Sequence, residues 1–99
     1  MVTTAIAAEL IQSDIAVVGQ LAREEILVPA STRPRMFRRA DVDAFAAEFV
    51  AAAELRRAMR LQPKGKLPHI PGLPECVFEF AGQRNRFYRR SECAHLLDR

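Results

Sequence analysis

The sequence predicts a small α+β protein in which short helices alternate with two β-hairpins. Apolar residues recur at helical spacing near the N-terminus, two later segments have the pattern of strands around turns, and one arginine-rich pattern occurs twice. The 99 residues, 49% of them hydrophobic, suffice for one compact domain or two very small units. We expect a first domain over 1–62, a proline-rich linker over 63–75 and a second unit over 76–99.

Two short helices are expected first. Residues 3–11 place apolar side chains on one helical face, and Thr3 or Thr4 is suited to cap the helix because a hydroxyl accepts a free N–H of the first turn. After a three-residue break, a second helix is expected over 15–25. Gly19 costs this helix about 1 kcal/mol relative to alanine, which indicates close approach of a neighbouring backbone. Two helices across so short a break form the skeleton of a helix-turn-helix.

A β-hairpin and a long helix are expected next. Residues 26–28 are predicted to form a strand, 29–34 a loop and 36–38 the returning strand. A third helix is predicted from Asp41, where negative charge suits the helix dipole, to about Leu61, and Pro63 ends it. The side chains expected to face the core are Val42, Phe45, Phe49, Ala52, Leu55 and Met59.

A second hairpin follows a segment that cannot be helical. Four prolines and two glycines between residues 63 and 74 mark a linker or an extended arm. Residues 76–80 alternate apolar and polar side chains as a strand does, 81–83 form a turn, and 86–89 return. Ser91 is expected to cap a last helix that runs to Leu97.

The arginine-rich pattern of the first hairpin recurs 51 positions later. Residues 33–42 (RPRMFRRADV) align without a gap on residues 84–93 (RNRFYRRSEC), so that four arginines, the large apolar pair and the acid at the helix start coincide. The alignment also predicts that Cys93 is buried, because it coincides with the core position Val42. Three prolines over 66–76 indicate that the preceding helices are not repeated.

The positive charge is clustered rather than spread along the chain. The net charge is only +3, but no Lys or Arg precedes Arg23, and arginine far outnumbers lysine. Arginine suits bidentate contacts to phosphate and to base edges. One cluster alone would indicate a solvated surface, whereas three clusters favour binding of a polyanion.

Three segments resemble the excisionase and MerR-type winged helix-turn-helix family: AAEL (7–10), V..LARE (18–24) and FRRADVDAF (37–45). The resemblance covers about the first half of the chain and implies binding to double-stranded DNA, with the second helix in the major groove and the hairpin as a wing on the backbone or minor groove. The family usually has glycine where Gln12 and Glu25 stand. The fold implied is a winged helix-turn-helix followed by a second, degenerate wing and a short helix.

The DNA-binding residues follow from the resemblance and from the repeat. The resemblance assigns Ser13, Gln20 and Arg23 on the second helix and Arg33, Arg35 and Arg38 on the wing; the repeat adds Arg84, Arg86 and Arg89. The implied role is a transcriptional regulator or an accessory factor of recombination or excision. A weaker resemblance to accessory proteins of transposition and site-specific recombination leaves a larger nucleoprotein complex open, as well as a homodimer.

The start of the second helix favours a different class of partner. Ile15 and Ala16 occupy positions that face the DNA in the family, and such a surface reads base edges poorly. The alternative is therefore a protein–protein interaction adaptor that keeps the fold without base readout. Arg39 and Arg90 lie beside the helix starts. The sequence favours neither of two roles for them: a structural ion pair with a neighbouring acid, or a contact to DNA.

Other functional classes find little support. No nucleophile motif or phosphate-binding glycine loop is present, so we expect no enzyme and no cofactor. The spacing of Cys76, Cys93, His69 and His95 matches no paired metal-ligand motif, so we expect no zinc. No apolar run approaches the ~20 residues of a membrane span, and the start lacks the pattern of a signal peptide, so the default location is the cytoplasm.

Overall fold

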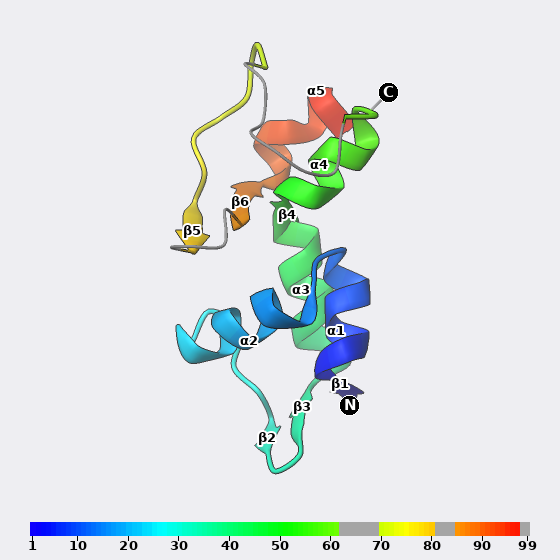
Figure 1. Ribbon diagram of the computed structural model, residues 1–99, viewed down its shortest axis with the longest axis vertical. Coiled ribbons are helices and arrows are strands. Elements are labelled where there is room, and N and C mark those ends of the chain that lie inside the picture. The colour runs from blue at the N-terminus through cyan, green and yellow to red at the C-terminus, as the bar shows by residue number, and fades with distance from the viewer. Residues whose placement is uncertain (62–69, 81–84, 98–99) are drawn as a thin grey trace. The chain divides into compact units, whose positions relative to one another are not determined.

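The computed structural model describes residues 1–61, 70–80 and 85–97, which form two compact units, Met1–Ala47 and Glu48–Arg99 (Figure 1). The described residues hold five α-helices, one short 3-10 helix and two three-stranded antiparallel sheets, which confirms a small α+β fold. The sequence placed the first boundary after residue 62, whereas the two units divide between Ala47 and Glu48.

The first unit begins with two capped helices. α1 spans Thr4–Ile11, and Thr3 Oγ1 accepts an N–H of its first turn at 3.2 Å, as predicted. α2 spans Ile15–Arg23, and Asp14 Oδ1 accepts an N–H of its first turn at 3.0 Å. The chain bends by 102° between the two helices, which is in the range of helix-turn-helix motifs.

Residues 26–28, predicted as a strand, instead cap the end of α2. Glu25 has a left-handed backbone with φ of 57°, and the N–H groups of Ile26 and Leu27 then donate to the Leu21 carbonyl at 2.9 and 3.2 Å. These bonds satisfy a carbonyl that the helix end leaves free and occupy N–H groups that a strand ladder would need. The prediction of a strand here was wrong, and Leu27 is buried as part of the first unit's core.

The first sheet contains the predicted hairpin and a strand that was not predicted. β2 (Ser31–Thr32) and β3 (Arg35–Phe37) pair antiparallel, and β1 (Val2–Thr3) lies on the other side of β3. The sheet order is therefore β1-β3-β2, with the arginine-bearing strand in the centre. Val2 pairs with Phe37, and both side chains are buried. The first hairpin, β2–β3 with its turn, is confirmed, with its strands displaced from the predicted positions.

The long third helix is interrupted by a strand. α3 spans Arg39–Glu48, β4 spans Phe49–Ala51 and α4 spans Ala52–Ala58, so the prediction of one helix over 41–61 was wrong. The apolar spacing suits a helix, but pairing in the second sheet overrides that local preference.

The second sheet has the order β4-β6-β5, with β5 at Phe78–Phe80 and β6 at Asn85–Arg89. The 3-10 helix η1 (Arg90–Cys93) and α5 (Ala94–Leu97) follow directly. Ser91 was expected to cap this helix, but it lies inside η1 and Arg89 occupies the cap position without a side-chain cap bond. The prediction for Ser91 was therefore wrong.

Part of the expected linker belongs to the core of the second unit. Ile70 is 8% exposed and packs in the main cluster, and Leu73 packs against it. The described part of the linker, residues 70–75, therefore packs against the unit, whereas residues 63–69 lie outside the described residues. The cluster also contains Val50, Ala52, Leu55, Tyr88, Cys93 and Leu96. Cys93 is fully buried, as its alignment with Val42 predicted.

The two units share one order of elements: strand, helix, hairpin, helix. β1–α1 corresponds to β4–α4 at an offset of 48 residues, so the expectation that neither preceding helix is repeated was wrong for the first one. α1 ends at Gln12 with φ of 60°, and α4 ends near Arg60 with φ of 57°. The same capping bond, an N–H to a carbonyl five residues earlier, closes both ends at 2.9 and 2.8 Å. Residues 70–77 contain no counterpart of α2.

Candidate nucleic-acid interface

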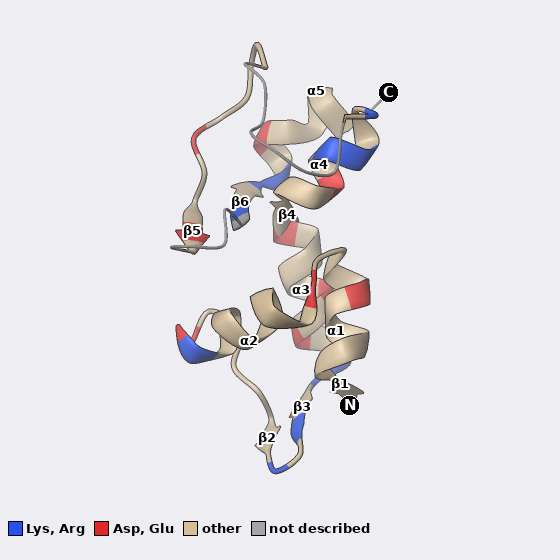
Figure 2. Cartoon of the chain, in the orientation of Figure 1, with Lys and Arg blue, Asp and Glu red and all other residues tan. Residues whose placement is uncertain are grey.

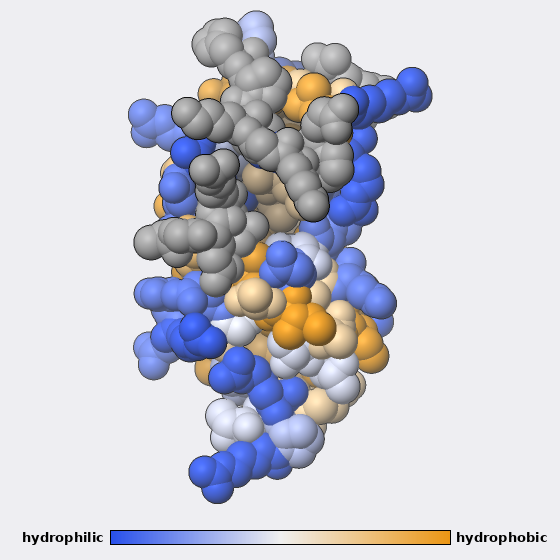
Figure 3. Space-filling view, in the orientation of Figure 1, coloured by the Kyte–Doolittle hydropathy of each residue, from blue (hydrophilic) through white to orange (hydrophobic). Residues whose placement is uncertain are grey.

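Three exposed arginines lie on the first hairpin (Figure 2). Arg33 lies in its turn, Arg35 begins β3 and Arg38 follows β3. Ser31 Oγ donates to the Pro34 carbonyl at 2.9 Å and holds the turn. Among the residues that the structure describes, none of the three arginine side chains makes an ion pair or hydrogen bond. Their guanidinium groups are available to an outside anion, and the end of the hairpin is hydrophilic in Figure 3.

Arg35 also connects the hairpin to α2. Its Nη1 lies 3.6 Å from the point that a Cβ on Gly19 would occupy. The close neighbour that the sequence predicted for Gly19 is present, but it is a guanidinium group rather than backbone. The first hairpin and α2 therefore meet at this point, and a side chain longer than alanine at position 19 would displace Arg35.

The predicted DNA-reading residues on α2 and its preceding turn are partly engaged in local contacts. Gln20 Nε2 donates to Glu24 Oε1 at 3.0 Å, and Arg23 Nη1 donates to Gln20 Oε1 at 3.3 Å. Both bonds are exposed to water, so they hold these side chains weakly. Ser13 is half-buried in the turn before α2. The structure thus brings Gln20 and Arg23 together, while Ser13 lies at the other end of the helix.

On the second hairpin (β5–β6), the corresponding arginines are paired with acids. Arg86 Nε lies 2.7 Å from Glu79 Oε2 across the β5–β6 pair, and Arg89 Nη1 lies 3.0 Å from Glu48 Oε1. These pairs are exposed and individually weak, but they leave this part of the hairpin close to neutral. Arg84, the third residue predicted here, lies outside the described residues.

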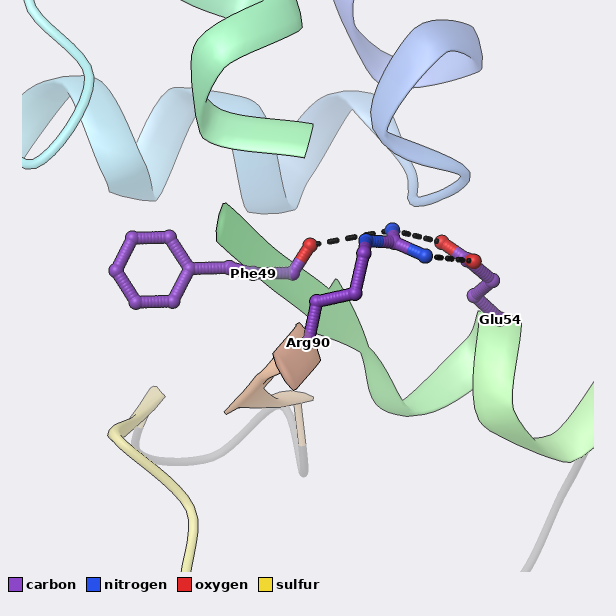
Figure 4. Close-up of polar contacts among 3 residues, drawn as sticks. All are labelled: Phe49, Glu54 and Arg90. Atoms are coloured by element: carbon purple, nitrogen blue, oxygen red, sulfur yellow. Dashed lines mark hydrogen bonds and ion pairs between the residues drawn. The ribbon is translucent and has the colours of Figure 1, made fainter. Parts of the chain in front are cut away.

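Arg90 and Glu54 form an ion pair that is more enclosed than those of Arg39, Arg86 and Arg89 (Figure 4). The two terminal nitrogens of Arg90 lie 2.7 and 2.8 Å from the carboxylate oxygens of Glu54 on α4, and one also donates to the Phe49 carbonyl at 3.3 Å. Hydrogen bonding to the Glu54 carboxylate, together with its negative charge, raises the pKa of the Arg90 guanidinium further above its ordinary value. Arg39, at the corresponding position of the first unit, pairs with Asp43 at 3.1 Å on the exposed surface of α3. Both are structural contacts of the kind expected beside a helix start.

The acids that pair with the second set of arginines have no counterparts in the first unit. In the strand register Thr32 lies opposite Arg35, where the second unit has Glu79 opposite Arg86, and at an offset of 48 Ile6 stands where it has Glu54. Thr32 is exposed, and Ile6 is 44% exposed. The two copies of the hairpin thus differ in the charges around their arginines rather than in the arginines themselves.

Comparison with known proteins adds no relative: no family model, no curated protein and no solved structure matches this chain. Within the described ranges, no group of three or more histidine, cysteine or acidic side chains is placed to hold a metal ion. Among the same residues no single helix is long and apolar enough to cross a bilayer, although α1 and α2 taken together, as a sharply bent pair, meet the criteria of length and composition.

Proposed function

We propose that this protein binds duplex DNA through the first hairpin of a winged helix-turn-helix. The observation that carries the proposal is the contrast between Arg35 and Arg38, which have no acidic partner in the described chain, and their counterparts Arg86 and Arg89, which are paired with carboxylates. A guanidinium that faces only water gains more from a phosphate than one that already has a carboxylate beside it.

Local geometry supports the winged helix-turn-helix. The two helices meet at 102° across a three-residue turn, and a hairpin follows. Gln12 and Glu25, where glycine is usual in the family that the sequence resembles, both have the left-handed backbone that glycine favours. The first hairpin, as the wing, would contact phosphates or a narrow minor groove, and Gln20 and Arg23 would make limited base contacts. The role proposed is that of a regulator or of an accessory factor in recombination.

The direct test compares matched pairs of arginines. Arg35→Ala with Arg38→Ala should weaken binding to a short duplex at least about tenfold at low salt and reduce the salt slope by about 2, because two phosphate contacts are lost. Arg86→Ala with Arg89→Ala occupies the same repeat positions and should change affinity by no more than about twofold. Fluorescence anisotropy over a salt series measures both. Equal losses from the two pairs, or no binding by the unaltered protein, would refute the proposal.

The reciprocal variants test whether the acidic partners cause the difference in DNA affinity between the two hairpins. Glu79→Gln and Glu48→Gln remove the negative charges beside Arg86 and Arg89 and keep similar side-chain shapes. Affinity for duplex DNA should then rise on every sequence tested, with a steeper salt dependence. Glu92→Gln serves as the control for net charge, because the Glu92 side chain makes no ion pair with Arg86 or Arg89 among the described residues. An equal rise in affinity there would show that local pairing is irrelevant.

A second candidate function is a protein–protein interaction adaptor. It is favoured by the turn between α1 and α2, where apolar and acidic side chains occupy the surface that faces DNA in the family that the sequence resembles. A pull-down that survives nuclease treatment, from a protein that shows no duplex binding, would favour this function over the first.

A further inference from the structure

A shallow groove lies where α1 turns into α2. Small side chains form much of its lining, with one isoleucine beside them and two carboxylates; the residues are Ala5, Ala8, Glu9, Ser13, Asp14, Ile15 and Ala16. Ile15 is 58% exposed, and Ile6, one position along α1 from Ala5, is 44% exposed. Hydrophobic atoms are visible over α1 and the start of α2 in Figure 3.

The exposed isoleucines are not needed for the core of the first unit. Val17, Val18 and Leu21 of α2 are fully buried, as is Ala7 of α1. Ile15 begins α2 directly after its cap, a position where any residue of moderate helix propensity suffices. A large exposed apolar side chain that lines a groove, rather than standing alone on the surface, is suited to contact with another molecule.

The charge of this surface is negative. The Glu9 side chain has no ion pair or hydrogen bond among the described residues, and Asp14 uses one oxygen to cap α2 while the residue stays exposed. No Lys or Arg occurs before Arg23, so no cation of the preceding segment offsets these charges; Figure 2 shows acidic positions on α1 and at the turn. The groove therefore repels phosphate and attracts cations.

We infer that this groove docks a partner-protein segment whose apolar side chains are flanked by lysine or arginine. A leucine or methionine side chain of the partner would pack on Ala5, Ala8 and Ala16 against Ile15. A lysine or arginine of the partner beside it would reach Glu9 or Asp14. Apolar contact supplies affinity, and the carboxylates select cationic partners over acidic ones. The proposal does not depend on DNA binding, since the three free arginines of the first hairpin do not line the groove.

The test titrates the isotopically labelled protein with a short helical peptide of leucine and lysine at amphipathic spacing. Backbone amide shifts should concentrate at Ala5, Ser13 and Ile15. A second peptide, in which glutamate replaces every lysine, should leave these amides unmoved. Shifts that lie elsewhere, or equal shifts with the glutamate peptide, would overturn the proposal.

Variants distinguish peptide binding in the groove from nonspecific electrostatic attraction of the peptide to acidic side chains elsewhere. Ile15→Ser with Glu9→Gln should weaken peptide binding about tenfold or more, while circular dichroism shows an unchanged melting temperature. Glu25→Gln removes one charge outside the groove and should leave affinity unchanged. Arg35→Ala with Arg38→Ala should also leave it unchanged, so loss of DNA binding and loss of peptide binding are distinguishable. If duplex DNA shifts Ala5, Ser13 and Ile15 instead, the groove is a nucleic-acid surface and the inference is wrong.

Discussion

Replacing Arg90 by methionine should destabilise the second unit far more than the same change at Arg39. The side chains of Arg90 and Glu54 are only 30% and 13% exposed, and the pair is bidentate with a further bond to backbone. Methionine keeps the apolar stem but leaves the Glu54 carboxylate in a half-enclosed site without its partner. The loss of these charge-assisted bonds should cost about 2 kcal/mol.

Arg39 provides the matched control, since it stands at the corresponding repeat position. Its pair with Asp43 is more than half exposed on both sides, and such pairs contribute about 0–0.5 kcal/mol. The protein has one tyrosine and no tryptophan, and Tyr88 lies in the core of the second unit, so tyrosine fluorescence during urea unfolding reports on that unit. Far-UV circular dichroism reports on both units.

A double-mutant cycle isolates the contact itself. In a Glu54→Gln background, Arg90→Met should cost much less than in the unaltered chain, because the carboxylate that it would strand is absent. Equal losses of unfolding free energy from Arg90→Met and Arg39→Met, or additive effects in the cycle, would refute the idea that the enclosure of this ion pair determines its contribution to stability.

Four further outcomes are expected. Gly19→Ala should stabilise the protein by up to about 1 kcal/mol in urea unfolding, because a Cβ there meets only ordinary contact and alanine favours the helix; destabilisation would show a tighter fit. Gln12→Gly and Arg60→Gly should each stabilise by about 0.5–1 kcal/mol, since glycine adopts the left-handed backbone without strain; a loss at either position would contradict the capping geometry. Burial raises the pKa of the Cys93 thiol, so the unfolded chain ionises first, and stability should fall as pH rises above 9.0, the ordinary thiol value. A thiol reagent should modify the partly exposed Cys76 in the folded protein and Cys93 only after unfolding; equal rates would place Cys93 at the surface.

Local chemistry in the sequence was sufficient for several elements. Thr3 and the break after Ile11 placed α1, and the apolar spacing after Ser13 placed α2. The strand and turn patterns placed the second hairpin and the returning strand of the first. These features depend on neighbours within a few residues, which is the range over which capping and periodicity act.

The outer strands could not be predicted from local patterns. β1 has two residues and β4 has three, and each exists because it pairs with a strand more than thirty residues away. Phe49, Val50 and Ala51 fit the helical spacing around them, so only the partner strand decides their conformation. The prediction of a strand at 26–28 failed for the opposite reason, because local bonds from the N–H groups of Ile26 and Leu27 to the end of α2 override the strand preference of the side chains.

The ion pairs of the second hairpin were only partly accessible to sequence reasoning. Glu79 and Arg86 lie opposite each other in the observed register, but the turn predicted at 81–83 is not centred between them, so the hairpin pattern brought them close without pairing them. Glu54 and Arg90 are 36 residues apart and meet only because β4 pairs with β6. An acid, Glu79, lies opposite Arg86, whereas Thr32 lies opposite Arg35. This difference in sequence distinguishes the charge of the two hairpins.

The most direct test of the central claim is an amide chemical-shift titration of the whole chain with a short DNA duplex at low salt. We predict amide shifts concentrated at residues 31–38 and at Gly19. Residues 85–89 should shift little, because Arg86 and Arg89 are already paired with carboxylates. Shifts of equal size on the two hairpins, or shifts confined to the second, would contradict it.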